Sequence, residues 1–187
     1  NLPCIAEKEC FVFENVADDL IKHMTESGAY LIKGEQVEKL KNVCLTEKNG
    51  KYVINKKWVG RDARKFLKEI GIDADPRLII CETEEMHPFV QTEMMMPILA
   101  IVRVKNIDEA VEMAVRAEHG CRHSAHIHSK NVDNLTKFAK AVETTIFVKN
   151  APSYAGIGAG GEGYTTFTIA GPTGEGLTAA HSFTRAR

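Results

Sequence analysis

The feature that most constrains the fold is a strand-like run, residues 98–104, that leads directly into a helical pattern. Asn106 and Glu109 have the spacing of an N-cap residue and its capping-box partner. The apolar residues that follow recur with the helical period and end at a glycine (Ile107, Ala110, Val111, Ala114, Val115 and Gly120). A buried strand joined to an amphipathic helix is the repeating unit of α/β proteins.

The same alternation of strand and helix extends over most of the chain. Strands are expected at residues 10–13, 77–81, 98–104, 124–128 and 145–149, and helices at 15–28, around 37–41, and at 61–70, 106–120 and 132–142. Residues 51–60 fit either a hairpin or a loop. Because short connections join these elements, we predict one α/β domain over residues 1–187, with a largely parallel sheet flanked by helices. A glycine-rich surface segment follows from Asn150.

Composition excludes several classes of partner. The 187 residues include 24 basic and 25 acidic side chains, a net charge of −1, which predicts neither a nucleic-acid nor a membrane partner. No apolar run reaches the length of a membrane span. Five cysteines without a CxxC pair indicate reduced thiols and a cytoplasmic location rather than a disulfide framework.

The first residues place a cysteine directly after a proline. The chain opens on Asn1 without an initiator methionine, so we expect the natural start to lie upstream. Pro3 suits the first turn of a helix, where the N–H groups and the helix dipole would favour a thiolate at Cys4. Cys4 is therefore a candidate nucleophile, and the alternative is an ordinary small core residue.

Residues 156–161 satisfy the pattern GxGxxG, but their context does not fit a dinucleotide site. Such a site follows a first strand, opens a helix and has an acidic residue about 20 positions later. Here a strand-like stretch follows the glycines near the end of the chain. We interpret the segment as a flexible loop at the mouth of a pocket, where glycines let the backbone approach a ligand closely.

Histidines and one cysteine gather between residues 119 and 128 (His119, Cys121, His123, His126 and His128). His126 and His128 would point to the same face of a strand, so a metal site is geometrically conceivable. The spacing matches no standard zinc pattern, and we predict no metal.

Residues 86–97 run directly into the strand at 98–104 and contain a carboxylate and three consecutive methionines. Glu93, on a loop just before a buried strand, is a candidate ligand for a hydroxyl or a ribose. The methionines would be core filler or a soft pocket wall, and core filler is the better interpretation from the residues alone.

Five segments, in order, together resemble the CoA-acylating aldehyde dehydrogenases of ethanolamine and propanediol utilisation in bacterial microcompartments: NLPCIAEKE (1–9), HPFVQTEMMMPILAIVRV (87–104), AHIHS (125–129), VKNAPSYAGIGAGGEGYTTFTIAGPTGEGLT (148–178) and SFTRAR (182–187). The resemblance implies that residues 1–187 are the catalytic domain, and that the NAD-binding domain is absent from this chain. It makes Cys4 the nucleophile that forms a thiohemiacetal and then an acyl-enzyme. Glu93 and Pro97 fall in the family motif ExFGP and would bind the nicotinamide ribose of NAD.

The sequence departs from the wider superfamily at two places. Met95 and Met96 replace the phenylalanine and glycine of ExFGP, and Glu9 stands where hydrolytic members carry an arginine. The resemblance therefore implies oxidation of a short aldehyde, acetaldehyde or propionaldehyde, to acyl-CoA, with NAD and CoA as cofactor and co-substrate. A non-acylating NAD-dependent aldehyde or semialdehyde dehydrogenase is the alternative, and an inactive assembly module is the alternative of another class.

The resemblance also bears on the tail and on partners. It places the tail near the catalytic pocket, where Tyr154, Gly158, Thr166, Phe167 and Thr168 are candidate contacts for the aldehyde and CoA. The expected partners are the small aldehyde, CoA and further copies of the full-length protein. The expected location is the cytoplasm, inside a microcompartment, with shell association through the region that precedes Asn1.

Overall fold

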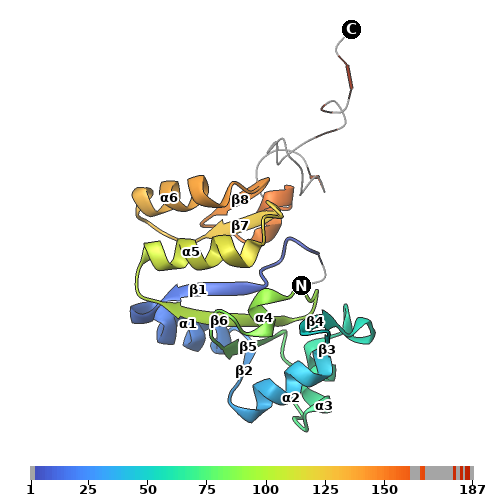
Figure 1. Ribbon diagram of the computed structural model, residues 1–187. Helices are drawn as coiled ribbons and strands as arrows, with labels where there is room; N and C mark the ends of the chain where they lie inside the picture. The colour runs from blue at the N-terminus through green and yellow to red at the C-terminus, as the bar shows by residue number, and fades with distance from the viewer. Residues whose placement is uncertain (1–2, 161–164, 167–178, 180–181, 183, 186–187) are drawn as a thin grey trace. The chain divides into compact units, whose positions relative to one another are not determined.

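The computed structural model describes residues 3–160, 165–166, 179, 182 and 184–185. The chain divides into two compact units, Asn1–Asn106 and Ile107–Arg187 (Figure 1), and each is described by itself. Within the described residues, no helix is long and apolar enough to cross a membrane.

The first unit is built on a four-stranded parallel sheet with the strand order β1-β6-β5-β2. Its elements, in chain order, are β1 (Glu9–Phe13), α1 (Glu14–Glu26), β2 (Ala29–Ile32), α2 (Glu35–Cys44), β3 (Leu45–Lys48), β4 (Lys51–Ile54), η1 (Lys56–Trp58), α3 (Ala63–Glu69), β5 (Leu78–Glu82), α4 (Pro88–Gln91) and β6 (Ile98–Val104). Strand β6 is the last in sequence but lies between β1 and β5. The parallel sheet with flanking helices confirms the predicted α/β fold class.

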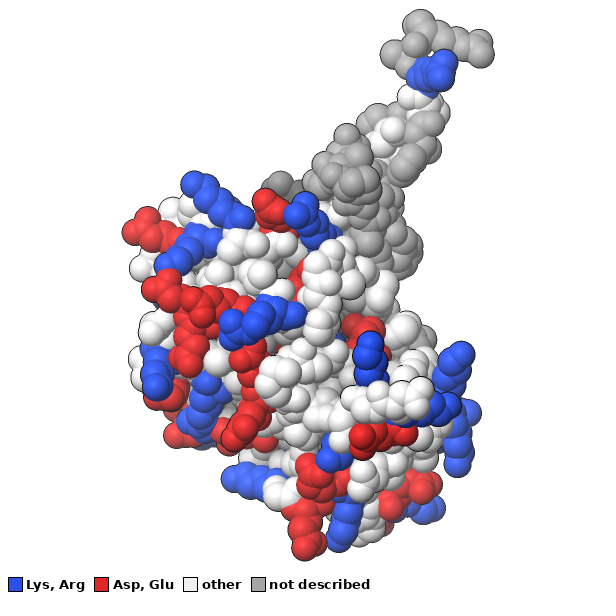
Figure 2. Space-filling model, in the orientation of Figure 1, with Lys and Arg blue, Asp and Glu red and all other residues white. Residues whose placement is uncertain are grey.

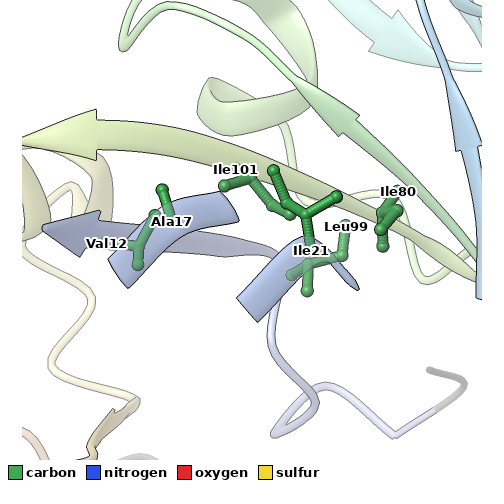
Figure 3. Packing of buried hydrophobic residues seen from close by; sticks show 6 residues of the cluster. All are labelled: Val12, Ala17, Ile21, Ile80, Leu99 and Ile101. Atoms are coloured by element: carbon green, nitrogen blue, oxygen red, sulfur yellow. The ribbon is translucent and has the colours of Figure 1, made fainter. Parts of the chain in front are cut away.

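Helix α1 packs its apolar stripe against one face of this sheet. Six buried residues from α1 and strands β1, β5 and β6 form the cluster (Figure 3): Val12, Ala17, Ile21, Ile80, Leu99 and Ile101. The helix begins at Glu14 with Phe13 as its N-cap, one residue before the expected start at residue 15. The apolar periodicity fixes the helix here without a capping side chain, because burial of the stripe outweighs the missing cap.

A two-stranded antiparallel hairpin, β3–β4, follows α2. Its turn is Asn49-Gly50, and both residues have positive φ angles, +53° and +73°. Two consecutive positive φ angles define the type I′ turn that matches the twist of a hairpin, and Asn-Gly is its preferred sequence. A hairpin is therefore present, and its first strand begins at Leu45, before the expected range.

The second unit contains α5 (Ile107–Glu118), β7 (Ser124–Ile127), α6 (Val132–Val142), β8 (Ile146–Lys149) and η2 (Ser153–Ile157). Strands β7 and β8 pair in parallel. Val111, Ala125, Phe138 and Val142 form the core that joins the two helices to the strands. The Asn131 side chain caps α6 by accepting hydrogen bonds from the backbone N–H groups of Asp133 and Asn134, at 2.8 and 3.2 Å.

Candidate active site

The predicted catalytic and cofactor residues of the first unit lie on segments that enter neighbouring strands. Cys4 precedes β1 by a few residues, and Pro97 directly precedes β6. Because β1 and β6 are parallel, with Glu9 opposite Ala100, both segments approach the sheet from its amino-terminal edge. Open α/β sheets usually place their ligand sites at the carboxyl ends of the strands, so this arrangement is the reverse of the general rule.

Cys4 lies in a turn and not at the start of a helix. The turn is closed by a hydrogen bond of 3.0 Å from the Ala6 N–H to the Pro3 carbonyl, and Cys4 is half-buried. Ile5 is only 1% exposed and anchors the turn in the core. No helix begins at Cys4, so the expectation that a helix end favours the Cys4 thiolate is wrong. Burial of the Ile5 side chain requires the backbone to turn at this position, and a helix would not make that turn.

The other cysteines differ from Cys4 in their surroundings, although all five are thiols. Burial, together with the nearby carboxylates of Glu7 and Glu9, raises the pKa of Cys10 to about 11. Burial raises the pKa of Cys44 and that of Cys81 to about 12. These three thiols are protonated and unreactive at neutral pH, because the thiolate is the nucleophile.

The loop that carries Glu93 is held by backbone hydrogen bonds on both sides. The exposed Glu93 carboxylate accepts a hydrogen bond from the Met95 N–H through Oε1, at 3.0 Å. Met95 has a φ angle of +53°, and its carbonyl accepts from the Gly60 N–H at 3.2 Å. The carbonyl of buried Pro97 accepts from the Ile79 N–H at 2.9 Å. The loop therefore presents a carboxylate to solvent from a fixed backbone.

The methionines of this loop mostly fill the core. Met94 and Met96 are 2% and 0% exposed, whereas Met95 is half-buried. The interpretation of the run as core filler holds for Met94 and Met96. Met95 is the methionine whose backbone shapes the loop.

A histidine fixes the start of the short helix before Glu93. His87 is the N-cap of α4, and its Nδ1 accepts a hydrogen bond from the Phe89 N–H at 3.1 Å. Its Nε2 lies 3.7 Å from Glu38 Oε1. Burial lowers the pKa of His87, and the nearby Glu38 carboxylate opposes that shift. A neutral His87 is the form that accepts at Nδ1, so the cap and the pKa agree.

The described part of the glycine-rich tail forms one compact turn. Tyr154 lies in η2 and is 44% exposed. Gly158 ends η2 with a φ angle of +82°, which favours glycine, and the Thr166 N–H donates to the Ile157 carbonyl at 3.0 Å. This bond places the Thr166 backbone beside the end of η2, where Gly158 follows Ile157. Phe167 and Thr168, and the strand expected around them, lie outside the described residues.

One tail glycine serves the protein's own packing. A Cβ atom on Gly156 would lie 2.4 Å from Ile146 Cγ2 and 2.8 Å from Val148 Cγ2. Both of these side chains belong to β8 and are buried. Glycine is therefore needed at position 156 because the backbone of η2 approaches strand β8 closely, and not because it approaches a ligand.

The residues of the histidine cluster extend from the end of α5 to the residue that follows β7. The His123 N–H donates to Glu118 Oε1 at 2.9 Å, and its ring Nδ1 lies 2.9 Å from Ser124 Oγ. In the part of the chain that the structure describes, no three His, Cys, Asp or Glu side chains lie close enough to hold a metal ion.

Comparison with known proteins gives a consistent result. The sequence model of the aldehyde dehydrogenase family matches residues 3–177. The chain is 47% identical to the acetaldehyde dehydrogenase (acetylating) EutE of Salmonella typhimurium, over 100% of this chain and 41% of that protein. Propionaldehyde dehydrogenase of Rhodopseudomonas palustris, solved with bound propionyl-CoA, is 52% identical with a TM-score of 0.91, over 98% of this chain and 41% of that one.

For a third relative, solved variants point to two individual side chains. Propionaldehyde dehydrogenase from the fucose utilisation microcompartment of Clostridium phytofermentans is 56% identical with a TM-score of 0.90, over 98% of this chain and 42% of that one. Variants of that protein with a cysteine or a histidine replaced by alanine, 118 positions apart, have also been solved. The chain spans about two fifths of the length of these relatives and belongs to the aldehyde dehydrogenase family.

Proposed function

We propose that residues 1–187 are the catalytic domain of a CoA-acylating aldehyde dehydrogenase, which oxidises acetaldehyde or propionaldehyde to the acyl-CoA with reduction of NAD. The observation that carries the proposal is the pairing of β1 with β6, which brings Cys4 and Glu93 to one edge of one sheet. The names of the relatives support the acylating reaction and the short substrate. In this proposal the NAD-binding domain lies outside these 187 residues.

The Glu93 loop fits a role in holding the cofactor. Glu93 Oε1 is occupied by the Met95 N–H, and this bond orients the carboxylate without using its second oxygen. An ionised carboxylate makes strong hydrogen bonds to hydroxyl groups, as a ribose would supply. NAD, when bound, supplies the hydride acceptor. In this role Glu93 and the backbone around Pro97 position the ribose and transfer no proton.

Cys4 carries the covalent chemistry in this proposal. Its sulfur, as the thiolate, would add to the aldehyde carbon to form the oxyanion of a thiohemiacetal. Loss of hydride from that carbon, for which NAD would be the acceptor, restores the carbonyl as a thioester on Cys4. The thiol of CoA then attacks the thioester carbonyl, so that the acyl group leaves on CoA and Cys4 is regenerated. The Cys4 backbone N–H is a candidate donor to the oxyanion of the adduct.

His123 is a further candidate that sequence reasoning missed. It follows Cys4 by 119 positions, close to the 118 that separate the cysteine and the histidine replaced in the Clostridium protein. Its hydrogen bonds to Glu118 and Ser124 fix the ring and its backbone. An oriented imidazole can act as a general base. The sequence offers His123 only as one member of the histidine cluster, and only the comparison singles it out.

The tail and the cellular setting belong to the same proposal. Tyr154, Gly158 and Thr166, with Phe167 and Thr168, would line the route of the aldehyde and CoA. The full-length protein would act as a homo-oligomer in the cytoplasm, inside a microcompartment. The source of the Clostridium relative supports that location.

The decisive experiment measures NADH formation by the full-length protein with propionaldehyde, with and without CoA. The proposal requires that turnover depends on CoA and yields propionyl-CoA. NADH formation that is indifferent to CoA, with propionate as the product, would favour the non-acylating alternative. Absence of turnover with propionaldehyde, with and without CoA, would favour an assembly module.

Alkylation should single out Cys4 among the half-buried and buried thiols. We expect iodoacetamide at pH 8 to label Cys4 far faster than Cys10, Cys44 or Cys81, because burial holds the pKa of those three at about 11 to 12. Peptide mass spectrometry over a time course measures each rate separately, including that of exposed Cys121. Equal rates for Cys4 and Cys10 would contradict the assignment of Cys4 as nucleophile.

Replacing Glu93 by glutamine should slow hydride transfer. The variant keeps the hydrogen bond from the Met95 N–H but loses the negative charge, so we expect kcat to fall about tenfold to a hundredfold with little change in the KM for aldehyde. Single-turnover NADH formation measures the step. Loss of only the basic limb of the pH–rate profile would instead indicate proton transfer by Glu93.

A further inference from the structure

Charge is distributed very unevenly along the first unit. Residues 48–68 hold eight of the chain's 24 basic residues and one of its 25 acidic residues, a net charge of +7 in a chain of net charge −1. The remaining 166 positions therefore sum to −8. All eight basic side chains are exposed: Lys48, Lys51, Lys56, Lys57, Arg61, Arg64, Lys65 and Lys68. We call this set the basic face.

The basic face lies on elements that are firmly anchored. Lysines project from hairpin β3–β4 and η1, and Figure 2 shows basic side chains gathered on the right of the view, where Figure 1 places the hairpin. Trp58 packs on Phe66 of α3, with ring centroids 5.0 Å apart. The Asn55 side chain donates to the Val43 carbonyl at 3.2 Å. The basic side chains are therefore attached to a backbone that is held in place by these contacts.

Carboxylates within the described residues leave most of this charge uncompensated. Arg64 lies 4.0 Å from both Asp73 and Asp75. Across the described part of the chain, none of the other seven has a carboxylate within 4.0 Å. A cluster of exposed cations with so few carboxylate partners raises the local concentration of anions.

One contact ties the basic face to the candidate active site. The Gly60 N–H donates to the carbonyl of Met95, whose own N–H holds the Glu93 carboxylate. Gly60 lies between Lys57 and Arg61 in the sequence. A ligand that reaches the Glu93 loop from this side therefore passes exposed cations.

We propose that the basic face steers the phosphate groups of CoA toward the active site. This inference rests on the proposed use of CoA as co-substrate. CoA carries a phosphomonoester, worth about −1.5 to −2 charges at pH 7, in addition to a diphosphate. The other 166 residues, at −8, would repel such a polyanion, and the basic face offsets that repulsion. Steering of this kind raises the association rate, so it acts on kcat/KM for CoA and leaves kcat unchanged.

The test neutralises four lysines that make no ion pair or side-chain hydrogen bond within the described residues: Lys48→Gln, Lys51→Gln, Lys56→Gln and Lys65→Gln, combined in the full-length enzyme. At an ionic strength of about 0.01 M we expect kcat/KM for CoA to fall about tenfold. The deficit should shrink at about 0.15 M, because salt screens exposed charges. Dephospho-CoA, which lacks the phosphomonoester, should show a smaller deficit, and KM for aldehyde should not change.

Two matched variants control for structural effects. The four lysines replaced by arginine should keep wild-type kinetics and salt dependence. A second quadruple variant, Lys22→Gln, Lys130→Gln, Lys140→Gln and Lys149→Gln, removes the same charge from exposed positions outside the basic face and should have little effect.

Several outcomes would overturn the inference. Unchanged salt dependence of kcat/KM for CoA, in an enzyme that requires CoA, would do so while leaving the proposed function intact. A fall in kcat/KM for NAD, with kcat/KM for CoA unchanged, would indicate that the basic face steers NAD and not CoA. Dissociation of the oligomer with unchanged CoA kinetics, measured by light scattering, would make the basic face an interface between copies. NADH formation without CoA would instead remove the proposed function itself.

Discussion

Replacing Cys4 by alanine in the full-length protein is expected to abolish aldehyde-dependent NADH formation, by about a thousandfold or more. No thiohemiacetal can form without the sulfur, and hydride cannot leave an aldehyde that has not been converted to a tetrahedral adduct. The loss should lie in kcat, measured by NADH absorbance at saturating aldehyde and CoA. Binding of NAD and CoA, measured by calorimetric titration, should stay within about twofold of wild type.

The matched control is Cys10→Ala. Cys10 lies in β1, only six positions from Cys4, and its thiol is held protonated by burial and by Glu7 and Glu9. Its replacement should leave kcat within about threefold, since it packs beside the core and takes no part in chemistry. Turnover close to wild type in Cys4→Ala, with normal thermal stability, would contradict the mechanism and the assignment of the site together.

The two central strands could be predicted from sequence, and of the two edge strands β1 could be predicted but β2 could not. Strands β5 and β6 are buried on both faces and therefore appear as unbroken apolar runs. Strand β2 has four residues and lies at the edge of the sheet, so it carries no comparable pattern. The Asn49-Gly50 turn is a clear hairpin signal that the interpretation of residues 51–60 did not use.

The candidate site could be predicted only through resemblance. Cys4 and Glu93 are far apart in sequence, and their approach to one sheet edge depends on the register between β1 and β6, which no local pattern encodes. The turn at Cys4 illustrates the competition between local and tertiary preferences. Pro3 suits a helix start, but the buried side chain of Ile5 determines the conformation.

Replacing Gly156 by alanine is expected to destabilise the second unit by about 2 to 3 kcal/mol. The new Cβ would lie 2.4 Å from Ile146 Cγ2 and 2.8 Å from Val148 Cγ2, distances at which β8 or η2 must shift. Both side chains are β-branched and buried, so neither can swing away. The unfolding temperature of the full-length protein should fall by several degrees, and amide exchange in residues 146–149 should accelerate.

Two comparisons separate steric overlap from other effects. In Gly160→Ala the new Cβ meets no atom of the described residues within 4 Å, and the φ angle of +75° leaves the backbone cost of about 1 kcal/mol. A double-mutant cycle with Ile146→Ala, which removes the nearest carbon, should show that Gly156→Ala costs at least about 1 kcal/mol less in that background. Additive effects of the two substitutions would mean that the overlap with Ile146 does not determine the stability of this turn. In that case the tail glycines would have to be explained by ligand approach, as the sequence suggested.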